Sequence, residues 1–309
     1  MRILLAILAC CLCGGAQDDV TFRAGVALVH VDAEVTSADG RLLSGLTQAD
    51  FRVLDEGKVQ RIVNFSTDEQ PLDLILLFDV SGSMRAVVGA VAGAAHQGLQ
   101  ELRPGDRVCV MAFNSHSWIL APFTENLDAV AHTLENELMR QRFGGGTLIQ
   151  AAVDDAAVRL RGEKRTERRR AVLIVTDNIG TRTRREETVI RDFWEADAIL
   201  SGLIISNPKF QTMNTVATIM GPQRLLMQAG MKGIAEKTGG DAIKSDDPGR
   251  AFQEMMHRIR ARYSLYFPLP ADKPGKPHTL QVELTGQAAK ANPKAVVKAR
   301  RGYVVPVNR

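Results

Sequence analysis

The feature that most constrains the fold of this chain is an almost entirely apolar run from Leu72 to Asp79. A strand of this composition is buried on both faces, as in parallel sheets that helices cover. Further buried strands are expected at 107–113, 171–176 and 198–205, and segments with helical spacing separate them. This alternation of strand and helix predicts an α/β fold with a doubly wound, mostly parallel sheet.

The segments between these strands predict the helices and one further strand. A short strand at 116–121 is expected at an edge of the sheet. Residues 206–222 show no clear period and are predicted to form a long loop. The expected helices span 86–102, 126–140, 148–160, 186–195, 225–237 and 250–261.

A β pattern appears on both sides of the α/β segment. Residues 17–68 alternate between apolar and polar types around turns, and residues 263–309 return to short apolar strands. Neither flank holds enough strands for a stable sandwich alone, but the two together do. We therefore predict a second, smaller β-sandwich-like domain made of 17–68 and 263–309, with the α/β domain, 69–262, inserted between them.

Residues 1–16 have the features of a secretory signal peptide. Arg2 supplies a positive start, residues 3–12 are apolar, and a small-residue cleavage site ends at Ala16. Cleavage there would remove all the cysteines except Cys109, which is expected to be a buried and unreactive thiol. The sequence thus predicts export, to the periplasm or out of the cell.

The net charge is +4, and basic residues concentrate at 161–170 and shortly after it. We interpret this run as a solvated helix end and loop, although a patch for an acidic partner is an alternative. Nucleic-acid binding is not favoured, because no aromatic residues lie between the basic ones. No apolar run approaches the ~18 residues of a membrane-spanning helix.

Three oxygen-bearing side chains follow the run at 72–79. Asp79, Ser81 and Ser83 stand at alternate positions, with Gly82 between the serines, at a predicted strand-to-helix turn. In open α/β sheets, ligands bind at the carboxyl ends of the strands. Hard divalent cations prefer such oxygen ligands.

Two more oxygen side chains are expected at the same edge of the sheet. Thr147 follows three glycines at a helix start, and Asp177 follows the strand at 171–176. Mg²⁺ demands near-octahedral oxygen coordination and keeps several waters, which hydroxyls, carboxylates and an open position satisfy. The sequence therefore predicts a Mg²⁺ site, with Mn²⁺ or Ca²⁺ as alternative ions, that accepts a carboxylate from another molecule.

These residues resemble the metal-ion-dependent adhesion site of von Willebrand factor type A domains. The family pattern is Asp-x-Ser-x-Ser, then Gly-Gly-Thr, then an aspartate at a strand end. The resemblance implies that the hydroxyls touch the ion, that the aspartates act through water, and that a partner's acidic side chain completes the site. The residues that match all five positions are Asp79, Ser81, Ser83, Thr147 and Asp177.

One position departs from the family pattern, and the flanks carry a second resemblance. Many members have glycine after the second aspartate, where this chain has Asn178. Residues 35–58 and the ending at 299–303 resemble a group of secreted bacterial type A domain proteins abundant in acidobacteria. That resemblance implies location and architecture rather than a ligand.

Three alternatives compete with the binding of a protein partner. A phosphoryl-transfer aspartate at Asp79 is not favoured, because the sequence has no phosphate loop of the Gly-x-x-x-x-Gly-Lys kind. Ser81, Asp177 and His257 follow the order of an α/β-hydrolase triad, but Asp79 and Ser83 occupy the glycine positions of the nucleophile elbow. A structural scaffold with a vestigial metal site is the third alternative. We interpret the chain as an exported, non-enzymatic binding protein that captures a carboxylate of a protein partner through a bound cation.

Overall fold

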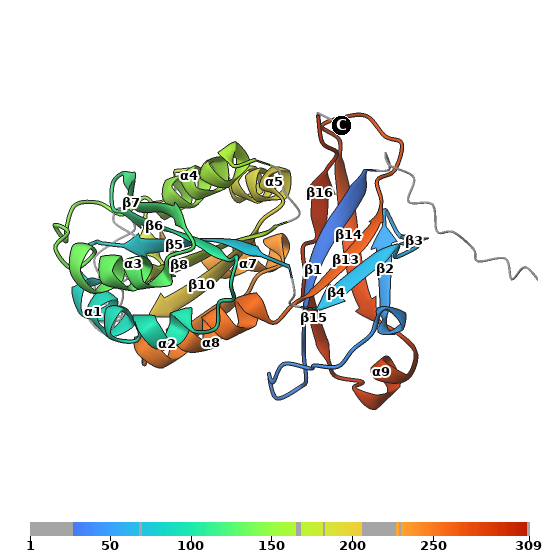
Figure 1. The fold of residues 1–309 in the computed structure, drawn as a ribbon. Coiled ribbons are helices and arrows are strands. Elements are labelled where there is room, and N and C mark those ends of the chain that lie inside the picture. The colour runs from blue at the N-terminus through green and yellow to red at the C-terminus, as the bar shows by residue number, and fades with distance from the viewer. Residues whose placement is uncertain are drawn as a thin grey trace, which may run out of the picture.

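The structure is a computed structural model in which two units lie side by side (Figure 1). One unit is a sheet with helices on both faces, and the other is made of two antiparallel sheets. Within the described part of the chain, no helix is long and apolar enough to cross a membrane. The described residues are 27–67, 70–164, 168–181, 183–205, 227–228 and 230–307.

The α/β unit is built on a six-stranded sheet. Its order places β5 and β8 at the centre, with the crossovers of a doubly wound fold, as the sequence predicted. Five strands are parallel, and β7 runs antiparallel to β6 at the edge where a short strand was expected. From one edge to the other the strands are β12 (Ala242–Ser245), β10 (Ile199–Ile205), β8 (Arg169–Thr176), β5 (Leu72–Asp79), β6 (Arg107–Phe113) and β7 (Ser117–Thr124).

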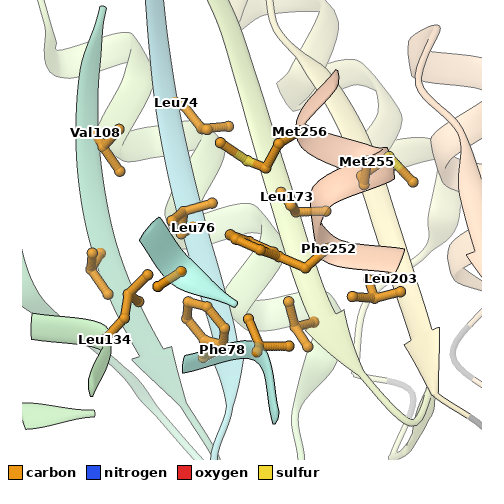
Figure 2. Close-up of a cluster of buried hydrophobic side chains, with 14 of the residues drawn as sticks. Leu74, Leu76, Phe78, Val108, Leu134, Leu173, Leu203, Phe252, Met255 and Met256 are labelled. Atoms are coloured by element: carbon orange, nitrogen blue, oxygen red, sulfur yellow. The ribbon is translucent and has the colours of Figure 1, made fainter. Parts of the chain in front are cut away.

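Helices cover both faces of this sheet, which explains why its central strands are apolar throughout. On one face, Phe252 of α8 packs against Leu76, Phe78 and Leu173 of the central strands (Figure 2). The helices of that face are α1 (Arg85–Gly93), α2 (Ala95–Leu99), α3 (Leu127–His132) and α8 (Pro248–Arg260). The other face is covered by α4 (Ile149–Gly162), α5 (Glu186–Ala196) and α7 (Met231–Thr238).

Three predicted helices differ from the structure. The helix expected at 86–102 is interrupted at Ala94, directly after Gly93, because glycine is a weak helix former. The helix expected at 126–140 is α3, capped by the Asn126 side chain, followed by the π-helical segment η2 (Thr133–Glu137). The helix expected at 225–237 begins only at Met231, since Gly230 has a positive φ of 73°.

Residues 227 and 228, which fall within that predicted helix, form a strand instead. Strand β11 (Met227–Gln228) pairs antiparallel with β9 (Ile179–Gly180), which directly follows the strand end at Asp177. The predicted long loop at 206–222 and the predicted signal peptide at 1–16 lie outside the described residues.

The second unit draws on both ends of the described chain. Strand β1 pairs with β13, so segments more than 200 residues apart share a sheet (Figure 1). Apolar side chains such as Val31, Val53 and Phe267 form the core between the sheets. One sheet has the order β15 (Val296–Ala299), β1 (Leu28–Thr36), β13 (Tyr263–Pro268), β4 (Asn64–Thr67), and the other β16 (Gly302–Val304), β14 (Pro277–Leu284), β2 (Phe51–Asp55), β3 (Lys58–Gln60).

Two short helices of this unit were not predicted. They are η1 (Gln48–Asp50) and α9 (Gly286–Ala291), and both are too short to show a helical period in the sequence.

Buried charges join the two units. Arg169 and Arg170 begin β8 and are almost fully buried, so the interpretation of 161–170 as a solvated run was wrong for these two residues. The Arg169 guanidinium donates to the Asp32 carboxylate of β1 over 3.0 Å and to carbonyl oxygens at the end of α8. A long polar side chain at the start of a strand can thus reach across a domain junction.

A second buried group at the junction is centred on Glu34 of β1. Its carboxylate accepts from Arg262 over 2.9 Å and lies 3.4 Å from Arg258 and 3.5 Å from Lys298. Arg258 and Lys298 also pair with Asp241, at 3.2 and 2.5 Å. These ion pairs connect the β domain to α8 and to the segment before β12.

Candidate metal centre

The candidate site lies where β5 and β8 end. Phe78 of β5 is in register with Val175 of β8, so Asp79 comes next to Thr176. The carboxyl ends of the two central strands thus bring the segment 79–83 and the segment 176–178 to one edge of the sheet. This edge is where ligands bind in open α/β folds.

The Asp79 carboxylate is oriented by two hydrogen bonds. The Ser81 backbone N–H donates to Asp79 Oδ1 and the Thr176 hydroxyl donates to Asp79 Oδ2, each over 2.8 Å. Thr176 Oγ1 in turn accepts the Asn178 backbone N–H over 3.1 Å. The two strand ends are therefore coupled through Asp79, and the role of Thr176 is one that sequence reasoning did not identify.

The electrostatics of Asp79 favour a cation. Its side chain is fully buried, and burial raises the pKa of the carboxyl to about 6, helped by the nearby Asp177 and opposed by the hydrogen bonds from Ser81 and Thr176. Among the described residues, no cationic side chain forms an ion pair with Asp79. A buried carboxylate without a counter-charge is costly, and a divalent cation would supply that charge.

The spacing of the oxygen atoms fits a small ion. The Ser83 hydroxyl donates to Asp177 Oδ2 over 2.7 Å, and the hydroxyls of Ser81 and Ser83 lie 3.4 Å apart. Neighbouring oxygens around octahedral Mg²⁺ are roughly 3 Å apart, given bonds of about 2.0–2.1 Å. Four of the five predicted residues, Asp79, Ser81, Ser83 and Asp177, thus form one connected cluster.

Thr147 reaches the same edge through its backbone. Gly144 of the glycine loop donates to the Val80 carbonyl over 3.0 Å, and Thr147 accepts from the Thr181 backbone N–H over 3.1 Å. A Cβ on Gly180 would lie only 2.6 Å from the Thr147 carbonyl oxygen, so the two loops are in close contact. The loop is held between the two strand ends, while contact of the Thr147 hydroxyl with an ion stays a prediction.

The glycines of this loop are required by its backbone. Gly144 and Gly145 have φ angles of 143° and 86°, which side chains disfavour. The side-chain amide of Asn114, directly after β6, donates to the Gly144 carbonyl over 3.1 Å, and the backbone carbonyl of Asn114 accepts from the Leu148 N–H. Asn114 was not predicted, although a polar residue directly after a buried strand is the same signal that marked Asp79 and Asp177.

Asn178 explains the departure from the family pattern. Its φ is 60°, in the left-handed region, which glycine adopts freely and asparagine more readily than other residues. Asparagine therefore adopts here a left-handed backbone that glycine would also tolerate. Asp177 Oδ1 accepts from the Ile179 N–H over 3.1 Å, which closes the turn.

The hydrolase triad is not assembled in the described structure. His257 of α8 pairs with Glu101 through Nδ1 over 2.8 Å, and both side chains are exposed. The hydroxyl partner of Asp177 is Ser83, and that of Ser81 is also Ser83. The described residues therefore bring no histidine to Ser81, where a nucleophilic serine needs one.

A family model connects this site with known proteins. Residues 74–180 match the von Willebrand factor type A domain. No curated protein matches the chain at a significant level.

Solved structures give broader matches. BatB from Bacteroides thetaiotaomicron is 17% identical with a TM-score of 0.47 and covers 61% of this chain and 97% of its own. A von Willebrand factor type A protein from Catenulispora acidiphila is 11% identical with a TM-score of 0.46 and covers 93% and 76%. The pilus adhesin SpaC from Lactobacillus rhamnosus GG is 10% identical with a TM-score of 0.46 and covers 83% and 48%.

Matches at this identity carry no argument about function. The family model spans both strand ends of the site, from β5 to the turn after Asp177. The sheet order, with its antiparallel edge strand, is that expected of the family. The α/β unit therefore contains a segment, residues 74–180, that matches the von Willebrand factor type A domain and lies in a doubly wound, mostly parallel sheet.

Proposed function

We propose that this protein is an exported, non-enzymatic binding protein that captures an acidic group of a protein partner through a divalent cation, with Mg²⁺ as the expected ion. The cluster of Asp79, Ser81, Ser83 and Asp177, tied together by hydrogen bonds, is the observation that carries the proposal. Thr147 is the fifth proposed ligand.

The residues have separate tasks in this proposal. Asp79 is held by Ser81 and Thr176, so its carboxylate stays in one orientation and supplies buried negative charge. The hydroxyls of Ser81, Ser83 and Thr147 are neutral ligands that would leave the ion electrophilic. Bound there, the cation would offer an open position to a carboxylate of the partner.

Isothermal titration with Mg²⁺ tests the metal site. Ser83→Ala should abolish ion binding while far-UV circular dichroism stays unchanged, because Ser83 is exposed and its loss opens no cavity. Asp79→Ala should abolish it as well. The matched control is Ser117→Ala, since Ser117 also donates to a carboxylate, that of Asp155 over 2.5 Å, but lies outside the cluster. Unchanged Mg²⁺ binding in both cluster variants would refute the site.

Capture of the partner is tested separately. The immobilised protein should retain a specific envelope protein in Mg²⁺ and release it in chelator or in excess of a glutamate-containing peptide. Ser83→Ala should not retain it, and Ser117→Ala should. A hydrolase would instead show esterase turnover that survives chelation, and a scaffold with a vestigial site would bind neither metal nor partner.

A further inference from the structure

A cavity lies at the junction of the two units, at the other end of β8 from the metal centre. Its volume is about 460 Å³, within the range of small-molecule sites. Arg168 and Arg170, at the start of β8, line it from the α/β unit, and His30 and Tyr266 line it from the β domain. Helix α5, which contributes Trp194, lies beside β16 here (Figure 1). We call this space the junction cavity.

The lining of the junction cavity carries a surplus of positive charge. Arg168, Arg170, Arg300 and His30 face it together with one carboxylate, that of Asp197. Burial disfavours the His30 cation, but the carboxylates of Asp32 and Asp197 outweigh that effect and raise the pKa of His30 to about 9. His30 is therefore positively charged at neutral pH, as the arginines are.

Carboxylates behind the lining do not cancel this surplus, because other arginines share them. Asp73 accepts from Arg168 over 2.6 Å and from Arg107 over 2.7 Å. Asp32 is 3.2 Å from His30 and 3.0 Å from Arg169, which lies outside the cavity. Each of these carboxylates thus divides its charge between a lining cation and a second cation.

Three buried polar atoms of lining residues have no hydrogen-bond partner in the described structure. They are Nε of Arg300, a residue only 6% exposed, Oε1 of Gln70, and Nε2 of His30, which lies 3.2 Å from Asp32 as an ion pair. The remaining nitrogens of Arg300 donate to Asp197, over 2.7 Å, and to the His30 carbonyl oxygen. Buried polar groups are nearly always satisfied, so an unpartnered guanidinium nitrogen beside a cavity points to an acceptor that is bound there.

The other walls are aromatic and apolar. Trp194, Tyr266 and Tyr303 line the cavity together with Leu28 and Leu269. The His30 ring stacks on Tyr266 with 4.9 Å between centroids, which presents a flat surface next to the cations. Such walls suit a flat or apolar body, and the cations suit an anionic head.

We propose that the junction cavity binds a small organic anion, with a carboxylate or phosphate head held by Arg300 and its neighbouring cations and a flat body held against the aromatic side chains. The ligand would touch both units at once, so it would stabilise their docking. This site does not depend on the proposed metal-dependent function.

Trp194 provides a direct signal for this site. The chain has only two tryptophans, and the other, Trp118, is in β7 at the far edge of the α/β sheet. In a Trp118→Phe protein, all tryptophan fluorescence comes from the junction cavity. The titration uses benzoate, phenyl phosphate and inorganic phosphate as anions and benzamide as the neutral counterpart of benzoate, all in excess chelator so that no metal centre can bind a carboxylate.

Benzoate or phenyl phosphate should change the Trp194 fluorescence with saturation, and benzamide should bind at least about tenfold more weakly because it lacks the charge. Comparison of the affinities for benzoate and phenyl phosphate shows whether the cavity prefers a carboxylate or a phosphate head. Equal binding of benzoate and benzamide, or no saturable change with either aromatic anion, overturns the proposal. This comparison uses an unaltered cavity and so needs no variant of its lining.

Two variants that each remove one positive charge test whether Arg300 binds the head of the anion. Arg300→Gln should weaken binding of the favoured anion at least about tenfold, since a charge-assisted hydrogen bond is lost. Arg301→Gln is the matched control, because it removes the same charge from the neighbouring residue. The Arg301 side chain is 63% exposed. Equal affinities in the two variants would show that the anion does not sit at Arg300.

Discussion

The replacement Glu34→Gln tests whether buried charge holds the two units together. Glutamine keeps the shape of the side chain and one acceptor oxygen but removes the negative charge. Arg258 and Lys298 retain Asp241 as a partner, whereas Arg262 has no other carboxylate at ion-pair distance among the described residues. The variant therefore leaves the Arg262 cation buried with no carboxylate at ion-pair distance.

The expected cost follows from that burial. Both side chains of the Glu34–Arg262 pair are fully buried, and burial lowers the pKa of the Arg262 guanidinium. Removing one partner of a buried ion pair destabilises a protein by about 3–5 kcal/mol. We expect the lower end, about 3 kcal/mol, because the Gly239 carbonyl still accepts from Arg262 over 2.6 Å. That is about a hundredfold change in the ratio of folded to unfolded protein.

Urea denaturation measures this loss, with circular dichroism and tryptophan fluorescence as two probes. Coincident transitions would show that the two units unfold together, which a single free energy of unfolding requires. The control is Glu283→Gln, which breaks a pair of similar length, 2.6 Å to Arg52, between side chains that are 31% and 48% exposed. An exposed pair contributes only about 0–1 kcal/mol.

Equal losses in Glu34→Gln and Glu283→Gln would refute the argument, because burial is the only feature claimed to separate the two pairs. A double variant, Glu34→Leu with Arg262→Met, should recover most of the loss, since an apolar pair leaves no buried charge uncompensated.

Three further predictions follow from single contacts. Asn178→Gly should keep the stability and Mg²⁺ affinity of the protein, whereas Asn178→Val should cost about 1–2 kcal/mol at φ 60° and weaken ion binding, as measured by denaturation and calorimetry. Burial opposes ionisation of Asp32, but Arg169 and His30 outweigh burial and hold the pKa of Asp32 below its ordinary value. The ionised carboxylate therefore stabilises the protein above about pH 4, and this stabilisation is lost as the pH falls below that value. Asp32→Asn should flatten the pH dependence of the free energy of unfolding in urea over that range. Burial raises the pKa of the Cys109 thiol to about 11, so it should react with a thiol reagent only after the protein unfolds, and fast labelling of the folded protein would contradict this.

The regular elements of the α/β unit could be predicted because their signals are local. The run at 72–79 is apolar throughout because helices cover both faces of β5, and this burial pattern is visible in the sequence. The interruption at Ala94 and the late start of α7 at Met231 were missed. In both cases the helical period continues through a glycine, and only the backbone angles decide where the helix stops or begins.

The candidate site could be predicted in part, for a related reason. Asp79 and Asp177 follow buried strands, and strand ends of a parallel sheet meet at one edge. Thr176 was missed because it reads as the last residue of an apolar strand, and its contact with Asp79 depends on the register of two strands about 100 residues apart. Its hydrogen bond exists only after the sheet has formed.

The sequence by itself determined the fold class and which strand ends carry oxygen side chains. An apolar strand that is buried on both faces, and the polar residue that follows it, are both visible in a short segment of sequence. Only the tertiary structure decided how the two units are joined and where charge is buried. Arginine is usually found at the protein surface, yet Arg169 and Arg300 lie buried at a junction that the chain forms by pairing β1 with β13. A charged side chain stays buried only where distant segments provide it with a partner, and a short stretch of sequence does not show which distant residues will pair.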